Sequence, residues 1–378
     1  MSAPWELAYG NAVPESLTRP SANYSVFPRK GQHSVLIEAV GEDKSIGIGE
    51  CYGLPDPGPT VHIARRLLAP AVVGESVLEI ECLWNRMMTL PMGVGMSRGY
   101  LMQAISGIDI ALWDLKAKHL GLSVGALLGG DTRREVPCYA SPVPYLDTPE
   151  ESQSQARRFV ERGFSAIKVK VGRGVATDMA HVAAVRDAIG PDVALMLDCN
   201  CAYSVREAIN LVGALRDLDI FWIEEPVAAD DHQGLLEVRR RAPMAIATGE
   251  NDFSVGGLRD VIANRAADII MPNVTRAAGL TGALKIAAFA EGHGLEIAPH
   301  GVGSIVGLAA SLHLMATISN GLIYEYNQLA NPMRDDLAPL PPFRDGLLGI
   351  PDGPGLGVVL DNDKVGFYAA QAVEADTH

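Results

Sequence analysis

The stretches AIKVKV (166–171), ALMLDCN (194–200) and DIFWIEEP (219–226) decide the fold of this chain. Each is a short apolar run that ends in polar residues, and the Ala- and Leu-rich segments between such runs have the periodicity of amphipathic helices. Five more runs repeat the pattern: EVPCYAS (135–141), AIATGEN (245–251), DIIMPN (268–273), LEIAPH (295–300) and LIYEYN (322–327). Strand–helix alternation at this spacing indicates parallel βαβ units, and eight such strands predict a closed barrel.

The polar residues that end these strands recur at the interval of one βα unit. Successive members lie 23 to 30 residues apart in the series Lys170, Asn200, Glu224, Glu250, Asn273, His300 and Glu325. The carboxyl ends of barrel strands meet at one mouth, where barrel enzymes place their catalytic groups. Polar residues also simply begin loops, but that interpretation does not account for three carboxylates and a lysine at inward-facing positions.

Residues 1–125 and 341–378 have a different pattern from the barrel, which we place at 126–340. SVLIEAV, GEDKS and IGIGECYG (34–53) predict a β-hairpin, and residues 62–74, 81–88 and 100–121 predict helices. We therefore expect an α+β capping domain ahead of a (β/α)7β barrel. The Pro- and Gly-rich tail, including IPDGPGLG (350–357), is expected to pack back on the cap.

Composition excludes several classes of protein. The net charge of −14 and the lack of a basic stripe argue against a nucleic-acid partner. No secretory signal or apolar stretch of membrane-spanning length is present, so we expect no membrane partner and a cytoplasmic location. The five cysteines are irregularly spaced and odd in number, which predicts reduced thiols.

Two lysines share one face of the strand at 166–171. Residues two apart on a strand point the same way, so Lys168 and Lys170 face inward while Val169 and Val171 face the helices. Mutual repulsion and partial burial are expected to lower the pKa of both lysines toward the working pH, as a general base requires. Alternating lysines also occur on exposed edge strands, but a closed barrel has no edge.

Three acids end three consecutive strands: Asp198, Glu224 and Glu250. Hard cations such as Mg²⁺ take oxygen ligands, and three carboxylates leave room on the ion for a carboxylate substrate. Pairing of one or two of these acids with Lys or Arg is the alternative. Strand alternation points Glu225 outward or toward the next strand, so Glu224 is the preferred ligand.

Two further groups face the same mouth. His300 ends its strand opposite the lysines and is a candidate acid or base, whereas His293 and His313 are interpreted as structural. Glu325 could donate a hydrogen bond to a substrate carboxylate if apolar surroundings keep it protonated.

Together, KVK (168–170), LDCN (197–200), WIEEP (222–226), GEN (249–251) and PH (299–300) resemble the enolase superfamily, in its mandelate racemase/muconate-lactonizing branch. The resemblance implies a capping domain whose loops close over the substrate, a homo-oligomer, and proton abstraction next to a carboxylate by way of an enediolate. It further implies these roles: Mg²⁺ ligands Asp198, Glu224 and Glu250; base Lys170, supported by Lys168; substrate contact Asn200; second acid/base His300; electrophilic acid Glu325.

Asn273 departs from the racemase-like pattern, in which an aspartate orients and charges the histidine. An amide can accept a hydrogen bond from His300 but brings no negative charge, so His300 should be a weaker base. We place Asn273 with the substrate-binding residues and expect abstraction by Lys170 alone.

These features predict a Mg²⁺-dependent lyase or isomerase that acts on a small carboxylate. The first reading is dehydration of a sugar acid or cycloisomerisation of its lactone. The alternatives are a racemase or epimerase, including one for hydroxyproline-type substrates, and a non-catalytic barrel that binds a metal–ligand complex. Specificity is expected from cap loops near 21–30 and 51–59.

Overall fold

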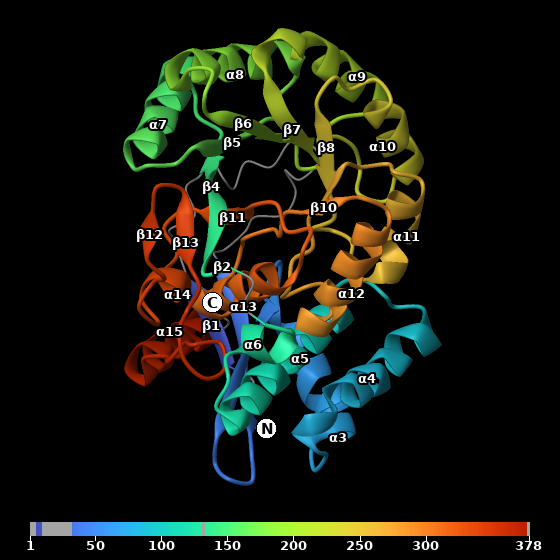
Figure 1. Cartoon of the computed structure of the whole chain (residues 1–378), viewed down its shortest axis with the longest axis vertical. Helices are drawn as coiled ribbons and strands as arrows, with labels where there is room; N and C mark the ends of the chain where they lie inside the picture. Colours follow the sequence, from blue (N-terminus) through green and yellow to red (C-terminus); the bar gives the residue numbers. More distant parts are fainter. Residues whose placement is uncertain (1–4, 10–31, 131–132, 376–378) are drawn as a thin grey trace.

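The computed structural model describes residues 5–9, 32–130 and 133–375 (Figure 1). The expected specificity segment at 21–30 lies outside these ranges. The backbone forms a barrel, drawn in the upper part of Figure 1, above a domain built from the two ends of the chain.

Eight parallel strands form the barrel, which confirms the predicted fold. They are β4 (Glu135–Val143), β5 (Ala166–Lys170), β6 (Ala194–Asp198), β7 (Ile220–Glu224), β8 (Ala245–Thr248), β9 (Ile269–Ile270), β10 (Glu296–Ile297) and β11 (Tyr324–Asn327). Consecutive strands pair from β4 to β10, and β11 pairs with β4. The ring closes through a parallel bridge between Ile297 and Gly321.

Seven main helices connect the strands, in the (β/α)7β order. They are α7 (Pro149–Glu161), α8 (Val175–Ile189), α9 (Val205–Ala214), α10 (His232–Arg239), α11 (Val255–Ala263), α12 (Gly279–Gly292) and α13 (Ile305–Thr317). Local sequence signals start several of them. In α7, Thr148 and Glu151 form a capping box with Pro149 in the first turn, so orphan backbone N–H groups are satisfied before packing begins.

Side-chain alternation along the strands builds the barrel interior in layers. Tyr139, Ala166, Met196 and Trp222 are buried in one inner cluster, toward the amino ends of the strands. Two residues further along β5, β6 and β7 come Lys168, Asp198 and Glu224, so charged side chains continue the same inward-facing rows. The apolar layer therefore forms the floor on which the polar layer rests.

The capping domain begins with a three-stranded antiparallel sheet of β1 (Trp5–Tyr9), β2 (Gln32–Val40) and β3 (Ile46–Tyr52). The pairing of β2 with β3 confirms the predicted hairpin. The helical elements α2 (Pro57–Ile63), η1 (Ala64–Leu68), α3 (Ala69–Val72), η2 (Val77–Glu79), α4 (Ile80–Val94), α5 (Tyr100–Leu120) and α6 (Val124–Leu128) follow.

The C-terminal segment contains α14 (Pro332–Asp335), β12 (Phe343–Arg344), β13 (Leu347–Gly349) and α15 (Asn362–Ala375). Strand β13 pairs antiparallel with the amino-terminal residues of β4, and α15 lies against β1 (Figure 1). The tail thus touches both the barrel and the capping sheet.

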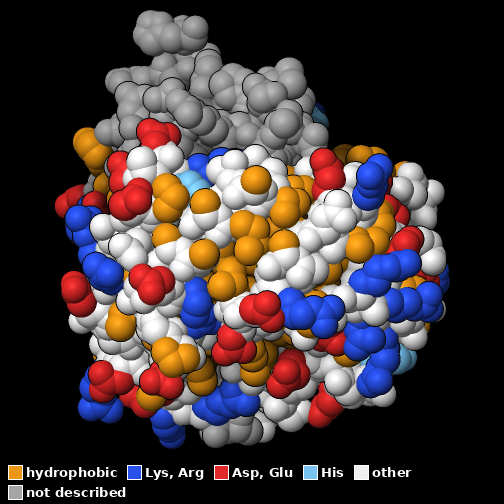
Figure 2. All heavy atoms as spheres, turned by 90° about the horizontal axis from the view of Figure 1, so that it is seen from above, with side chains coloured by type: hydrophobic (Ala, Val, Ile, Leu, Met, Phe, Trp, Pro, Cys, Tyr) orange, Lys and Arg blue, Asp and Glu red, His pale blue; other side chains and the backbone are white. Residues whose placement is uncertain are grey.

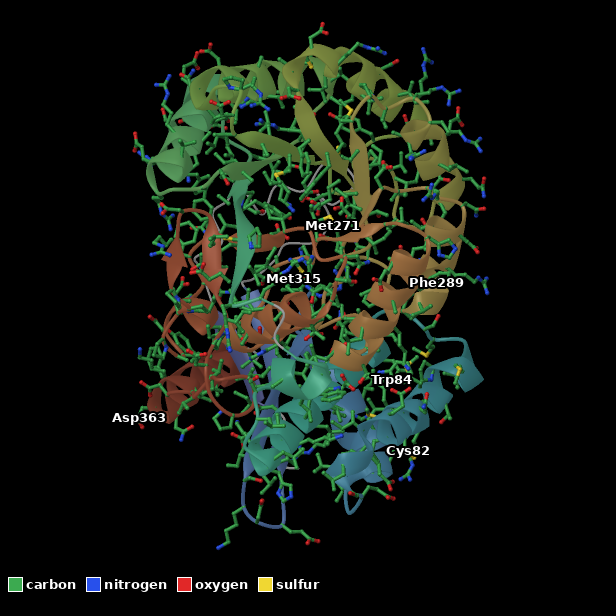
Figure 3. The ribbon with its side chains drawn as sticks, in the orientation of Figure 1. Cys82, Trp84, Met271, Phe289, Met315 and Asp363 are labelled. Carbon is green, nitrogen blue, oxygen red and sulfur yellow. The ribbon has the colours of Figure 1, made fainter. Side chains whose placement is uncertain are left out.

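Two tryptophans of the cap contact the start of α12. The indole N–H of Trp84 donates to Ala278 O at 2.8 Å, and that of Trp113 donates to Thr281 Oγ1 at 2.9 Å. Figure 3 shows Trp84 just below α12. These contacts join the cap to the barrel on the side of β9 and β10.

The prediction of reduced cysteines is confirmed in the described residues. All five cysteines are free thiols. The helices found there include none with the length and apolar character needed to cross a membrane. On the face shown in Figure 2, acidic and basic side chains are interspersed.

Candidate active site

The two lysines and the first two acids form one buried cluster at the ends of β5, β6 and β7. Lys170 Nζ donates to Asp198 Oδ2 at 2.5 Å and to Asn200 Oδ1 at 2.8 Å. Lys168 Nζ lies 2.8 Å from Glu224 Oε2 and 2.7 Å from Glu325 Oε1. Strand register explains the arrangement, because Lys170 pairs with Asp198 and Asp198 pairs with Glu224 across neighbouring strands.

The expected lowering of the lysine pKa values is wrong for this arrangement. Burial lowers the pKa of Lys170, but the surrounding carboxylates, Asp198 foremost and then Glu250 and Glu224, together outweigh burial and the repulsion from Lys168, so the pKa is raised. For Lys168, burial is likewise outweighed, by Glu224 and Glu325. The sequence argument counted the ammonium pair and omitted the carboxylates that approach it.

The three predicted metal ligands end neighbouring strands, but each turns to a different nitrogen. Asp198 bonds Lys170, Glu224 bonds Lys168, and Glu250 Oε2 lies 3.0 Å from His300 Nε2. As the side chains stand, the described part of the chain contains no group of three His, Cys, Asp or Glu residues that could hold a metal. The expected convergence of the three carboxylates is therefore not seen.

Glu224 nevertheless has the character of an unfilled ligand. Its Oε1 atom is buried and has no hydrogen-bond partner among the described residues. Burial and the neighbouring Asp198 raise the pKa of Glu224 well above its usual value, which favours a proton on this carboxyl. A divalent cation could replace that proton and satisfy the orphan oxygen, so these oxygen donors fit Mg²⁺.

Hydrogen bonds around Asn273 assign the tautomer of His300. Thr275 N and Thr275 Oγ1 both donate to Asn273 Oδ1, at 2.9 and 2.7 Å. The amide nitrogen therefore faces His300 Nδ1, at 2.8 Å, and donates to it. Nδ1 must accept, so the proton of the neutral ring sits on Nε2, toward Glu250. The expectation that the amide accepts from His300 has the wrong direction.

This arrangement keeps His300 neutral. Imidazolium would set an N–H on Nδ1 against the Asn273 amide hydrogens. Burial also lowers the pKa of His300, although Glu250 and Glu325 oppose the shift. The neutral ring thus carries its N–H at Nε2, which lies 3.0 Å from Glu250 Oε2 without a hydrogen bond to it among the described residues.

Glu325 is ionised rather than protonated, contrary to expectation. Burial raises its pKa, but the charge of the Lys168 ammonium and the hydrogen bonds from Lys168 and Ser141 outweigh burial and hold the pKa well below its usual range. Glu325 also accepts from Ser141 Oγ at 2.5 Å and from Gly301 N at 2.9 Å. It therefore ties β11 to the lysine strand and to the segment that follows β10.

A second polar chain beside the mouth was missed. Asn251 Nδ2 donates to both oxygens of Glu225, at 2.8 and 3.0 Å, and Arg276 Nη2 donates to Asn251 Oδ1 at 3.0 Å. The Arg276 guanidinium lies 4.6 Å from the ring centroids of both Tyr52 and Phe253. Glu225 is buried and turns toward the next strand, one of the two directions that the strand alternation left open, whereas its hydrogen bonds from Asn251 were not predicted.

Two family models together cover most of the chain. Residues 12–129 match the N-terminal domain of mandelate racemase/muconate lactonizing enzymes, and residues 151–364 match the enolase C-terminal domain-like family.

Individual relatives span almost the whole chain. A D-galactarolactone cycloisomerase of Agrobacterium fabrum is 36% identical over 88% of this chain and 90% of its own. A D-xylonate dehydratase of Haloferax volcanii is 32% identical over 91% and 86%. A Streptomyces coelicolor racemase solved with bound magnesium is 28% identical, with a TM-score of 0.87 over 97% of this chain and 98% of that one. The chain is therefore an enzyme of the mandelate racemase/muconate lactonizing branch of the enolase superfamily, as its sequence motifs predicted.

Proposed function

We propose that the enzyme removes the α-proton of a sugar-acid carboxylate and expels an oxygen from the β-carbon. Lys170 is the base, since its amine is the one basic group in the cluster with partial exposure, 17% for its side chain against 0% for Lys168. Asn200 accepts from Lys170 and orients it. Lys168 and Glu325 form a charge-balanced ion pair within the polar layer of the site.

Asp198, Glu224 and Glu250 would hold a Mg²⁺ ion in this proposal. The fit rests on the unpartnered Glu224 oxygen and on three oxygen donors at adjacent strand ends. When bound, the ion supplies positive charge that stabilises the developing anion and offsets the carboxylates that raise the Lys170 pKa.

Among eliminations, we favour opening of a lactone whose ring oxygen is on the β-carbon. Lys170 takes the α-proton, the Cβ–O bond breaks, and the ring oxygen leaves as a carboxylate; the enol that remains becomes a 2-oxo acid. Such a leaving group needs only a hydrogen bond, which neutral His300 can give from Nε2. Hydroxide must be protonated as it leaves, and a neutral imidazole is a weak acid for that step. The hydrogen bonds of Asn273 carry this preference.

A panel assay in D₂O with Mg²⁺ tests the proposal. D-Galactarolactone, D-xylonate and other aldonates and aldarates are supplied, and 2-oxo acid formation and deuterium at the α-carbon are measured. We expect turnover of a lactone that disappears in Lys170→Met. Epimerisation without 2-oxo acid would favour the racemase alternative, which the uncharged Asn273 disfavours. Failure of every panel member to react, with intact fold and Mg²⁺ binding, would favour a non-catalytic role.

A further inference from the structure

Glu50, on β3 of the capping domain, is fully buried against the barrel and lies outside the lysine–carboxylate cluster. Its carboxylate accepts from Ser304 N at 2.8 and 3.0 Å, from Ser304 Oγ at 2.6 Å and from Gly307 N at 2.8 Å. Ser34 Oγ of β2 donates to it as well, at 2.6 Å. None of the ion pairs seen among the described residues includes Glu50.

These donors lie at the start of α13, for which Ser304 is the N-cap. Burial raises the pKa of Glu50, and the hydrogen bonds from the outward-pointing N–H groups of this first turn oppose that shift. The unusual feature is that the carboxylate comes from another domain, more than 250 residues away in sequence.

The connection between β10 and α13 spans residues 298–304 and contains both His300 and the N-cap Ser304. Hydrogen bonds from the barrel also hold it, among them Gly301 N to Glu325, His300 N to Pro272 O at 3.3 Å, and Asn331 Nδ2 to Gly303 O at 2.8 Å. The backbone is closely packed at Gly301 and at Gly307. A Cβ on Gly301 would lie 1.8 Å from Glu325 O, and one on Gly307 would lie 2.8 Å from Glu50 Oε2. The segment is therefore packed between β11 of the barrel and β3 of the capping domain.

The lysine side of the site is held differently. After β5, Gly172 N donates to Asp178 Oδ2 at 2.8 Å, and Tyr145 Oη donates to Val171 O at 2.7 Å. Both partners belong to the barrel. The cap therefore reaches the histidine side through Glu50, whereas these anchors of the lysine side are internal to the barrel.

We propose that Glu50 is a positioning residue through which the capping domain sets the place of His300, independently of Lys170. Docking of β3 on the barrel then determines whether Nε2–H of His300 points at the leaving group. The part of this inference that concerns catalysis rests on the proposed elimination; the part that concerns the segment does not.

Hydrogen–deuterium exchange of the whole chain tests the segment without any substrate. Glu50→Ala should raise exchange of the peptide with His300 and Gly301 roughly tenfold, because the donors at Ser304 and Gly307 lose their acceptor. Peptides of β5 and β6 should not change. Glu50→Gln should largely restore protection, since its amide oxygen can still accept from Ser304 N and Gly307 N.

Asp114→Asn is the matched control. Asp114 is another buried carboxylate of the cap. It accepts from Ile48 N and Leu356 N, each at 2.7 Å, but not from the connection at 298–304 or from Gly307. Should Glu50→Ala not fold, Glu50→Asp takes its place, because the shorter side chain draws the same carboxylate away from Ser304 and Gly307. Unchanged exchange at His300 in both Glu50 variants, or an equal rise in Asp114→Asn, would overturn the proposal.

Turnover supplies a readout that a purely structural role would not move. With a substrate from the panel, Glu50→Ala should lower kcat for 2-oxo acid roughly tenfold to a hundredfold with little change in KM. Deuterium uptake into recovered substrate, which needs only Lys170, should fall less, so the ratio of uptake to product rises. An equal fall of both rates would overturn the proposal. If no panel member reacts, the proposed elimination fails, while the exchange experiment still decides the role of Glu50.

Discussion

Replacing Asn273 with aspartate should convert His300 from a neutral donor into a charged acid or base. One aspartate oxygen can keep both hydrogen bonds from Thr275, which leaves the other oxygen facing His300 Nδ1, 2.8 Å from the present amide nitrogen. That oxygen must accept, so Nδ1 gains a proton. An anion at this distance raises a histidine pKa by about 1–3 units, or about 1.4–4 kcal/mol in favour of imidazolium.

Long-range ¹H–¹⁵N correlation spectra of ¹⁵N-histidine-labelled chain measure the effect directly. The His300 signals are identified by their loss in His300→Asn. We expect Nε2–H with an unprotonated Nδ1 in the wild type, and a protonated Nδ1 with a higher midpoint in Asn273→Asp. Asn200→Asp, the same change beside Lys170, should leave the His300 signals in place. A wild-type ring already protonated on Nδ1 at neutral pH would refute the tautomer assignment.

The other predictions concern the base, the cation and a buried carboxyl. Lys170→Met should lower α-proton exchange roughly 10²–10⁴-fold while Mg²⁺ binding, followed by calorimetry, persists. Mg²⁺ at a hundred times its dissociation constant should stabilise the wild type by about 2.7 kcal/mol in urea unfolding, and Glu224→Gln should lose most of this. Burial raises the pKa of Asp109 from 3.8 to about 7, so its contribution to stability is complete below pH 3.8 and lost as pH rises toward 7. Between pH 5 and pH 8, urea unfolding should therefore show Asp109→Asn gaining about 2.6 kcal/mol of stability relative to the wild type; an equal difference between the two proteins at both pH values would exclude this.

The barrel and its inward-facing polar residues could be predicted because they follow from strand periodicity. Lys168, Asp198 and Glu224 obey the alternation along β5, β6 and β7, and register alone brings them together. Prediction was incomplete where the strand ends. Glu225 lies beyond the end of β7 and turns toward the next strand, as one of the two predicted directions allowed, but its hydrogen bond from Asn251 was not predicted.

The protonation states of Lys170 and His300 also could not be predicted from the sequence. Whether Lys170 is raised or lowered in pKa depends on the 2.5 Å approach of Asp198, and the direction of the Asn273 hydrogen bond depends on Thr275, two residues later. The contact of Glu50 with Ser304 spans two domains, and no local pattern marks it.

The indole contacts of Trp84 and Trp113 allow intrinsic tryptophan fluorescence to report on the contact between the cap and the barrel. Both side chains donate to the start of α12, whereas Trp222 is sealed inside the barrel. Separation of the cap from an intact barrel would expose the indoles of Trp84 and Trp113 further to solvent and leave that of Trp222 buried. Emission would then move to longer wavelength before the far-ultraviolet circular dichroism of the barrel is lost, so cap release and barrel melting can be followed separately in unlabelled protein.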